Sequence, residues 1–214
     1  MSNFIITIAR GLGSGGSHIA RKLSETLSIP CYDEEILRMA SDYSGISEKY
    51  FFEANEKINK GQIAVNSSKG VFNSTLYGIG DKRYLSNENM FNYQAVIIKE
   101  LALEGKESCI IIGKAANHII GSLHNVIKIN IQAPFDYCIG NIVKRKHISR
   151  KEAEKMIITT DRYRQNYYKY YTGRNWTDPK EYDISINTGE IDEDYAVNMI
   201  IGILRYKGFL QESL

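Results

Sequence analysis

The segment from residue 4 to residue 27 restricts the fold of this chain more than any other. A β-branched run from Phe4 to Ile8 leads into a glycine-rich turn, and an amphipathic helical pattern from Gly15 to Leu27 follows. In this context backbone N–H groups and a helix N-terminus can surround a phosphate group. The turn contains Gly11, Gly13, Gly15 and Gly16, which permit positive φ angles and the close approach of an anion. The alternative is that these glycines serve only the tight packing of strand and helix.

Strand-like and helix-like patterns alternate along the rest of the chain. Further β-branched runs cover Cys109 to Ile112, Val126 to Ile131 and Tyr182 to Ile186, and a short strand is expected to end at Tyr32. Helical patterns cover Asp33 to Ala40, Asn87 to Glu104, Pro134 to Lys144, Ser149 to Tyr171 and Glu193 to Tyr206. The run CIII is continuously apolar, which is typical of a parallel strand covered by helices on both faces. The alternation predicts a three-layer α/β/α fold with a sheet of about five parallel strands.

The chain is expected to form a single domain. Its 214 residues, of which 43% are hydrophobic and 24% charged, suit one globular core, and three prolines leave little room for a disordered linker. Residues 41–86 mix charged, glycine and serine residues with short apolar turns, which predicts an insertion of small helices and loops. Ser149 and Glu152 have the spacing of a capping box, and Gly173 follows that long helix as a stop signal.

Charge and cysteine content argue against several classes of protein. A formal net charge of +2 does not by itself imply a nucleic-acid or membrane partner, so anion binding must come from local clusters. The three cysteines lie far apart without CxxC spacing, which argues against a disulfide framework and a zinc site. The N-terminus lacks a long apolar secretory segment, and no run approaches the roughly 18 apolar residues of a membrane span. We therefore expect a cytoplasmic protein.

The side chains of the glycine-rich turn differ from the phosphate-binding pattern GxxxxGK[ST]. In one alignment Gly11 and Gly16 are the flanking glycines, and Ser17 and His18 take the places of the lysine and the hydroxyl residue. In the other, Arg10 and Gly15 take the glycine places, Gly16 the lysine place and Ser17 the place of the magnesium-binding hydroxyl. Neither alignment supplies the lysine, and Arg10 is the candidate for the missing positive charge. The predicted phosphate-binding residues are Gly11, Gly13, Ser14, Gly15, Gly16 and Ser17.

Several longer blocks occur in a distinctive order along nearly the whole chain. They are ITIARGLGSGGSHIAR, IPCYDEEIL, the pair FNYQAVIIKELA and SCIIIGKAANHII, and DRYRQNYYKYYTGRNWTDPKEYDISINT. Together they resemble the cytidylate kinase-like family of P-loop nucleoside-monophosphate kinases, and the gapless match of the first block favours the alignment that begins at Arg10. The resemblance implies a fold of the P-loop nucleoside triphosphate hydrolase type. It also implies a nucleotide triphosphate at the glycine loop, an acceptor nucleotide beside the 41–86 insertion, and a basic lid-like helical region at 145–180.

Candidate catalytic residues lie after the second strand and in the lid-like region. Asp33 could hold magnesium through water or orient an acceptor hydroxyl, and its alternative role is to cap the helix that follows. Arg162 and Arg164 lie in the sequence DRYR, which resembles the family's lid motif, and a lid places positive charge around the transferring group. For the nearby Lys144 to Lys146, a solvated helix face is the serious alternative.

Two further residues are expected in the acceptor site. Where cytidylate kinases carry Gly-Arg-Asp, this chain has Gly113, Lys114 and Ala115, so Lys114 keeps the positive charge and the carboxylate is missing. Gln94 could contact a base edge, or it could be a buried, hydrogen-bonded glutamine. The tyrosines around Arg164 also suit a site for single-stranded nucleic acid, but packing of the lid helix explains them more simply, and no nucleic-acid partner is expected.

These patterns predict ATP-dependent phosphorylation of a small acceptor, such as the nucleoside monophosphate CMP, with Mg²⁺ held partly by Ser17. The competing interpretation is a nucleotide- or phosphate-binding module that has lost turnover. Both interpretations require the same pocket and a small-molecule nucleotide as partner, and they leave the oligomeric state open. Arg10, Asp33, Arg162 and Arg164 are the predicted catalytic residues.

Overall fold

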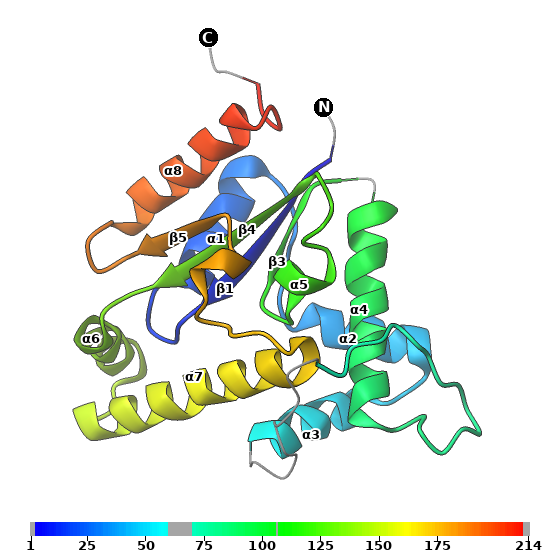
Figure 1. Ribbon diagram of the computed structural model, residues 1–214. Coiled ribbons are helices and arrows are strands. Elements are labelled where there is room, and N and C mark those ends of the chain that lie inside the picture. The colour runs from blue at the N-terminus through cyan, green and yellow to red at the C-terminus, as the bar shows by residue number, and fades with distance from the viewer. Residues whose placement is uncertain (1–2, 60–69, 106, 212–214) are drawn as a thin grey trace.

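The chain folds into three layers around a parallel sheet of five strands (Figure 1). The computed structural model describes residues 3–59, 70–105 and 107–211. The strands are β1 (Ile5–Arg10), β2 (Cys31–Tyr32), β3 (Cys109–Ile112), β4 (Val126–Gln132) and β5 (Ile184–Asn187), and their order is β2-β3-β1-β4-β5. All strand pairs are parallel. The predicted fold class is confirmed.

Two apolar cores lie on opposite faces of this sheet, because successive residues of a strand point to opposite sides. On one face, Ile6 and Ile8 of β1 pack with α1 (Gly16–Leu27) and α8 (Glu193–Tyr206). On the other face, Ile5 and Ala9 belong to a core that includes residues of α2 (Glu35–Ser44), α3 (Glu48–Asn59), α4 (Asn87–Leu103), α5 (Ala116–Ile119) and α7 (Arg150–Thr172). β3 is buried along its whole length, as the apolar run CIII predicts.

A third, smaller core joins α6 (Phe135–Lys146) to the first half of α7. Ile139 and Ile142 of α6 pack there with Ala153 and Ile157 of α7, and Leu12 of the glycine-rich turn packs against them. The capping box of Ser149 and Glu152 is formed, and Gly173 ends α7 with a positive φ of 72°. We refer to residues 135–172 as the α6–α7 unit.

The predicted insertion at 41–86 begins inside a helix, since α2 continues to Ser44 before α3 follows. Residues 60–69 lie outside the described residues. Residues 70–86 run along α4, where the buried Asn89 holds them with its amide. Asn89 Nδ2 donates to the carbonyls of Tyr77 and Tyr84 at 2.8 Å each, and Asn89 Oδ1 accepts from the Tyr77 N–H at 2.8 Å.

Two element boundaries differ from the sequence prediction in ways that matter for the site. β1 extends two residues beyond Ile8, because Ala9 and Arg10 continue to pair with Asn130 and Ile131 of β4. The second helix begins at Glu35 and not at Asp33. Both differences place a charged side chain at the carboxyl edge of the sheet, where ligands of open α/β folds bind.

Candidate functional site

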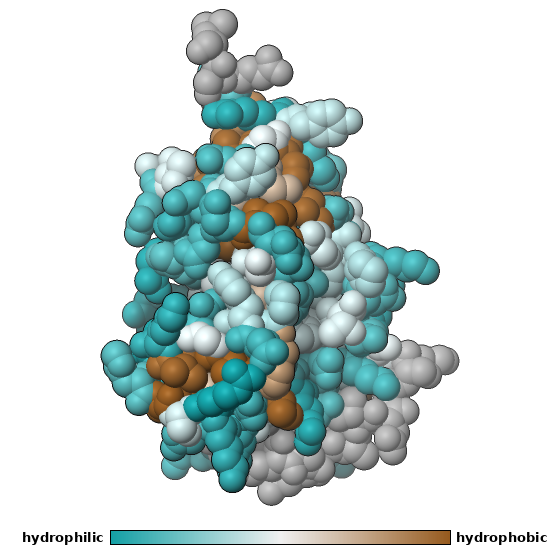
Figure 2. All heavy atoms as spheres, turned by 90° about the vertical axis from the view of Figure 1, so that its left-hand side faces the viewer, coloured by the Kyte–Doolittle hydropathy of each residue, from teal (hydrophilic) through white to brown (hydrophobic). Residues whose placement is uncertain are grey.

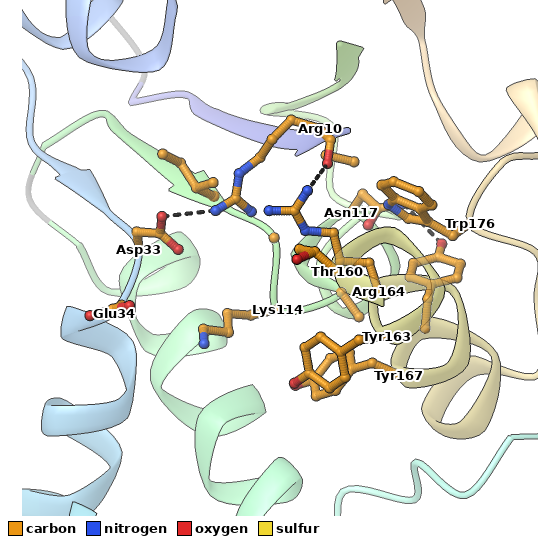
Figure 3. Close-up of a pocket in the computed structure, with 15 residues that line it drawn as sticks. Arg10, Asp33, Glu34, Lys114, Asn117, Thr160, Tyr163, Arg164, Tyr167 and Trp176 are labelled. Carbon is orange, nitrogen blue, oxygen red and sulfur yellow. Dashed lines mark hydrogen bonds and ion pairs between the residues drawn. The ribbon is translucent and has the colours of Figure 1, made fainter. Parts of the chain in front are cut away.

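A pocket of about 230 Å³ lies beyond the carboxyl ends of β1, β2 and β3 (Figure 3). Arg10, Asp33 and Lys114 line it from the strand ends, and Thr160, Arg164 and the aromatic residues of α7 line its opposite wall. The parallel strands place these residues together, because their carboxyl ends meet at one edge of the sheet. The pocket therefore combines three cationic side chains with two carboxylates, those of Asp33 and Glu34.

The guanidinium of Arg10 connects the glycine loop to the second strand. Its Nε donates to Ser17 Oγ at 3.2 Å, and its Nη2 forms an ion pair with Asp33 Oδ2 at 2.9 Å. Gly113 leaves room for this guanidinium, since a Cβ at that position would lie 2.9 Å from Arg10 Nη1. Arg10 therefore contacts Ser17 and Asp33 directly, and all three are predicted site residues.

The side chain of Arg10 occupies the space where a side chain at position 16 would lie. A Cβ added to Gly16 would lie 2.6 Å from the Cβ of Arg10 and 3.3 Å from its Cγ. Any side chain at position 16, including the lysine of the usual phosphate-binding pattern, would collide with the stem of Arg10. The absence of that lysine and the presence of Arg10 are thus two parts of one local arrangement.

The glycine loop presents several N–H groups for which the described residues supply no acceptor. Gly13 and Gly15 have φ angles of 88° and 79°, which bring successive amides to one concave side. Gly15 is the N-cap of α1 without a side-chain hydrogen bond, and the first turn of this helix carries no acidic residue. Within the described part of the chain, no group accepts a hydrogen bond from the N–H of Gly13, Gly15 or Ser17. An anion can bind here on the backbone alone.

The same glycines also serve tight packing. A Cβ at Gly13 would lie 2.6 Å from the carbonyl oxygen of Cys138 in α6, and one at Gly15 would lie 2.6 Å from Glu193 Oε1 in α8. Ser14 is buried, its hydroxyl donates to the Gly11 carbonyl at 2.9 Å, and its own carbonyl accepts from Thr188 Oγ1 at 2.6 Å. The two interpretations of the glycine-rich turn, anion binding and close packing, are therefore compatible.

Lys114 is a half-buried cation that has no partner among the described residues. Gly113, Lys114 and Ala115 all have left-handed φ angles, of 70°, 53° and 54°, and such backbone conformations concentrate at ligand sites. Figure 3 shows the lysine side chain directed toward the side of the pocket that carries Asp33 and Glu34. No described residue forms a hydrogen bond or ion pair with its ammonium group, and burial lowers the pKa of Lys114.

The carboxylates that follow β2 make different interactions. The side chain of Asp33 binds Arg10 and does not cap α2, whose N-cap is Glu34 and has no side-chain hydrogen bond. Glu35 accepts a hydrogen bond from the Asp33 N–H at 2.9 Å, and this bond lowers the pKa of Glu35. Asp33 therefore does not cap α2, which was one of the two roles considered for it.

Arg164 and Asp161 of α7 bind the backbone of the glycine loop. Arg164 Nη1 donates to the carbonyl of Arg10 and to Asp161 Oδ1, both at 2.9 Å, while the Leu12 N–H donates to Asp161 at 3.0 Å (Oδ1) and 3.3 Å (Oδ2). Burial lowers the pKa of Arg164 to about 10 and raises the pKa of Asp161. Asp161 was not among the predicted site residues, although it is part of the sequence DRYR.

The predicted phosphate-binding residues between Gly11 and Ser17 do not line the pocket, and neither do two of the six residues predicted for catalysis or acceptor binding. Arg162 is exposed on α7 and does not line the cavity, because residues two apart on a helix point in different directions. Gln94 is only 2% exposed, donates to the carbonyl of Met90 at 3.3 Å and accepts from Tyr167 Oη at 3.5 Å. Its geometry matches the alternative of a buried, hydrogen-bonded glutamine.

The aromatic residues of α7 line one wall of the pocket and pack against the core. Tyr171 stacks on Phe91 of α4 with ring centroids 3.8 Å apart, and Tyr167 packs edge to face with both rings. Burial raises the pKa of Tyr163, whose ring also lines the cavity. Packing of the helix explains these tyrosines, as the simpler interpretation of the sequence proposed.

The basic cluster at the end of α6 lies on the surface. Lys144, Arg145 and Lys146 are exposed in the last helical turn, where positive charge is favourable. Figure 2 views the side of the molecule that is on the left in Figure 1, and most of this face is hydrophilic. A solvated helix face accounts for this cluster.

Among the described residues, no group of three or more His, Cys, Asp or Glu side chains is arranged to hold a metal ion. In the same part of the chain, every helix is too short or too polar to cross a membrane.

Comparisons with known proteins agree with this geometry. The model of the cytidylate kinase-like family matches residues 5–190. A cytidylate kinase of Sulfolobus acidocaldarius is 34% identical over 95 residues, which are 42% of this chain and 52% of that protein. The match thus spans about half the length of this curated relative.

Solved structures extend the likeness to nearly the whole fold. A crystal structure of an uncharacterized protein from Eubacterium ventriosum has a TM-score of 0.68 and 27% identity, covering 95% of this chain and 99% of the other. A shikimate kinase from Bacteroides thetaiotaomicron has a TM-score of 0.51 and 10% identity, covering 94% and 98%. The second likeness concerns the fold alone.

Proposed function

This chain belongs to the cytidylate kinase-like family, and on that premise we propose that it transfers the γ-phosphoryl group of ATP to a small acceptor. The acceptor class we propose is a nucleoside monophosphate such as CMP. One observation carries the proposal: the pocket brings Arg10, Lys114 and Arg164 together, and Arg10 also contacts Ser17 of the glycine loop. Because ATP is a cytoplasmic metabolite, a cytoplasmic location is part of the same proposal.

The residues of the pocket suit phosphoryl transfer, which depends on positioning and on charge more than on covalent chemistry. Negative charge spreads over the transferring group, and preorganised cations in a partly dry site stabilise it. Arg10 would supply the charge that a lysine at position 16 supplies in the usual pattern, since its stem fills that space. Lys114 would bind an anionic group of the acceptor, and Asp33 would orient the acceptor or a metal-bound water.

The oxygen atoms near the loop fit a hard cation such as Mg²⁺. Magnesium is usually held by one or two protein oxygens together with substrate phosphates, so a cage of several carboxylates is not required. Ser17 Oγ and the carboxylate of Asp33 both contact the guanidinium of Arg10. When bound, Mg²⁺ supplies positive charge to the phosphates, and Ser17 would hold it directly, with Asp33 acting through water.

A second candidate is a nucleotide-binding module without turnover. The observation that favours it is the pairing of Arg10 with Ser17 and Asp33, because these proposed catalytic and metal-binding groups then bind one another. Ala115 also stands where cytidylate kinases carry a carboxylate. Transfer of phosphate from MgATP to a panel of nucleoside monophosphates separates the two candidates: a phosphorylated product supports the kinase, whereas nucleotide binding without product for any acceptor leaves only the module.

The anion site of the loop can be tested without catalysis. Titration with inorganic phosphate or sulfate should shift the backbone amide resonances of residues 13–17, because three of these amides find no acceptor in the part of the chain that the structure describes. The measurement is a two-dimensional amide NMR titration at constant ionic strength. Saturating phosphate that moves another region and leaves residues 13–17 unchanged would contradict the site.

Replacing Lys114 with methionine should weaken the binding of the acceptor and stabilise the folded protein. Loss of a charged hydrogen bond to the acceptor should raise its dissociation constant about 10- to 100-fold. The free energy of unfolding should rise by about 1 kcal/mol, because a partly buried, unpaired ammonium costs desolvation energy. Calorimetric titration with CMP and denaturant unfolding measure the two effects.

The stability gain should depend on pH in a defined direction. Folding lowers the pKa of Lys114, so the cost of its charge is fully present below the folded pKa and is lost as pH rises from there to the unfolded value. The difference between variant and wild type should therefore shrink as the pH approaches 10.5, the ordinary lysine value. The exposed Lys82 provides the matched control, Lys82→Met, which should change neither quantity. Unchanged CMP affinity in Lys114→Met would exclude Lys114 from the acceptor site.

A further inference from the structure

Three peptide groups of the glycine loop are hydrogen-bonded by side chains of the α6–α7 unit. Arg164 donates to the carbonyl of Arg10, Asp161 accepts from the N–H of Leu12, and Asn141 Nδ2 donates to the carbonyl of Gly13 at 2.9 Å. Figure 3 shows Arg164 reaching the backbone of Arg10 from α7. The conformation of the loop is therefore linked to the position of this unit.

Asp161 differs from Arg164 and Asn141 because it brings a negative charge to a loop that we propose binds anions. Both of its carboxylate oxygens lie within 3.3 Å of the Leu12 nitrogen, and Oδ2 lies 3.6 Å from the position of a Cβ on Gly11. The carboxylate is one-quarter exposed, at 26%, so water screens it only in part. A carboxylate on a loop amide is the same kind of interaction that the loop offers to phosphate.

We propose that Asp161 is an internal anion of the glycine loop, occupying the Leu12 amide in the unliganded protein and setting the affinity of the loop for phosphate groups. The inference rests on the proposed function, since it takes the loop to be the phosphate site. A phosphate that binds the Gly13 amide, which directly follows Leu12, would meet the negative charge of Asp161.

The cations around Asp161 offset this repulsion only in part, because each also binds another group. Arg164 pairs with Asp161 Oδ1 at 2.9 Å, and the guanidinium of Arg10 is already bound to Asp33 and Ser17. The Cys138 thiol of α6 also faces Asp161, and burial raises its pKa to about 11, so it is neutral near pH 7. On the other side of the loop, the carboxylate of Glu193 lies beside Gly15 and pairs with His18. One carboxylate therefore lies at Leu12 and another beside Gly15.

A purely structural role for Asp161 makes the opposite prediction. If its carboxylate only held the loop in a binding conformation, removing the charge would loosen the loop and weaken phosphate binding. An internal anion instead competes with the ligand, so removing the charge should strengthen binding. Asp161→Asn separates the two roles, because the amide oxygen can still accept from Leu12 and Arg164 while the negative charge is lost.

The experiment compares wild type, Asp161→Asn and Asp136→Asn by calorimetric titration with sulfate and, separately, with MgATP. Asp136 is the matched control, because it is an exposed aspartate of the same α6–α7 unit that pairs with Arg150 and does not contact the loop. Removing the like charge bound at Leu12, next to the Gly13 amide, should tighten sulfate binding about 10-fold or more in Asp161→Asn. Asp136→Asn should stay within about twofold of wild type, as is usual for an exposed charge.

Each result decides the question. Tighter sulfate binding in Asp161→Asn alone supports the internal anion. Equal or weaker binding in a folded Asp161→Asn protein, with sulfate still binding to wild type, overturns the inference and leaves the proposed function intact. Absence of both sulfate and MgATP binding in all three proteins overturns the inference together with the proposed phosphate site.

Discussion

Replacing Arg10 with methionine is expected to lower the rate of phosphoryl transfer from MgATP about 100- to 1,000-fold, because losses of this size follow removal of one preorganised charge at a transition state. Arg10 fills the space of the missing loop lysine and is the cation in contact with Ser17. Methionine keeps much of the apolar stem and removes the guanidinium. The measurement is the steady-state rate with the acceptor that gives product, and MgATP affinity where no product forms.

Two further variants show whether the charge of Arg10 is responsible. Arg10→Lys keeps the charge but cannot contact Ser17 and Asp33 at the same time with a planar group, so a partial loss is expected. Arg21→Met removes an exposed arginine from α1 and should leave the rate unchanged. Full activity in Arg10→Met, with a normal unfolding transition, would show that another group supplies the charge.

Replacing Gly15 with valine is expected to abolish phosphate binding, with a loss of affinity of at least about 100-fold. Gly15 has a φ of 79°, a conformation that a β-branched residue adopts only under strain. Its new side chain would also begin 2.6 Å from Glu193 Oε1, at the mouth of the loop. The amides at the start of α1 would then lose the geometry that presents them to an anion. Amide NMR titration with phosphate measures the effect.

The matched control is Gly202→Val in α8, where a Cβ meets nothing within 4 Å and the glycine is exposed. This variant should bind phosphate like wild type. Thermal unfolding of both variants separates loss of the site from loss of the fold, since Gly15→Val should retain a cooperative transition at a lower midpoint. Phosphate-induced amide shifts of wild-type size in a folded Gly15→Val protein would show that the anion does not bind at this loop.

Several features of this protein follow from neighbouring residues, and the sequence alone predicts them. The strand, glycine turn and helix at the N-terminus, the buried run CIII and the capping box at Ser149 each depend on side chains within a few positions of one another. Their periodicity and turn chemistry also determine the fold class, because alternating strands and helices have few ways to bury their apolar faces. Arg10, Ser17, Asp33 and Lys114 were placed near one site by the same reasoning and by resemblance.

The connections between distant residues were decided only by the tertiary structure. The contact of Asp161 with Leu12 joins positions 149 apart, and nothing in the local sequence marks this aspartate as a partner of the loop. The sharing of space by Arg10 and Gly16, the burial of Gln94 and the outward direction of Arg162 depend equally on how the strand ends and α7 pack together. Local patterns specify which element a residue belongs to, whereas packing specifies what its side chain contacts, and the chemistry of a site depends on those contacts.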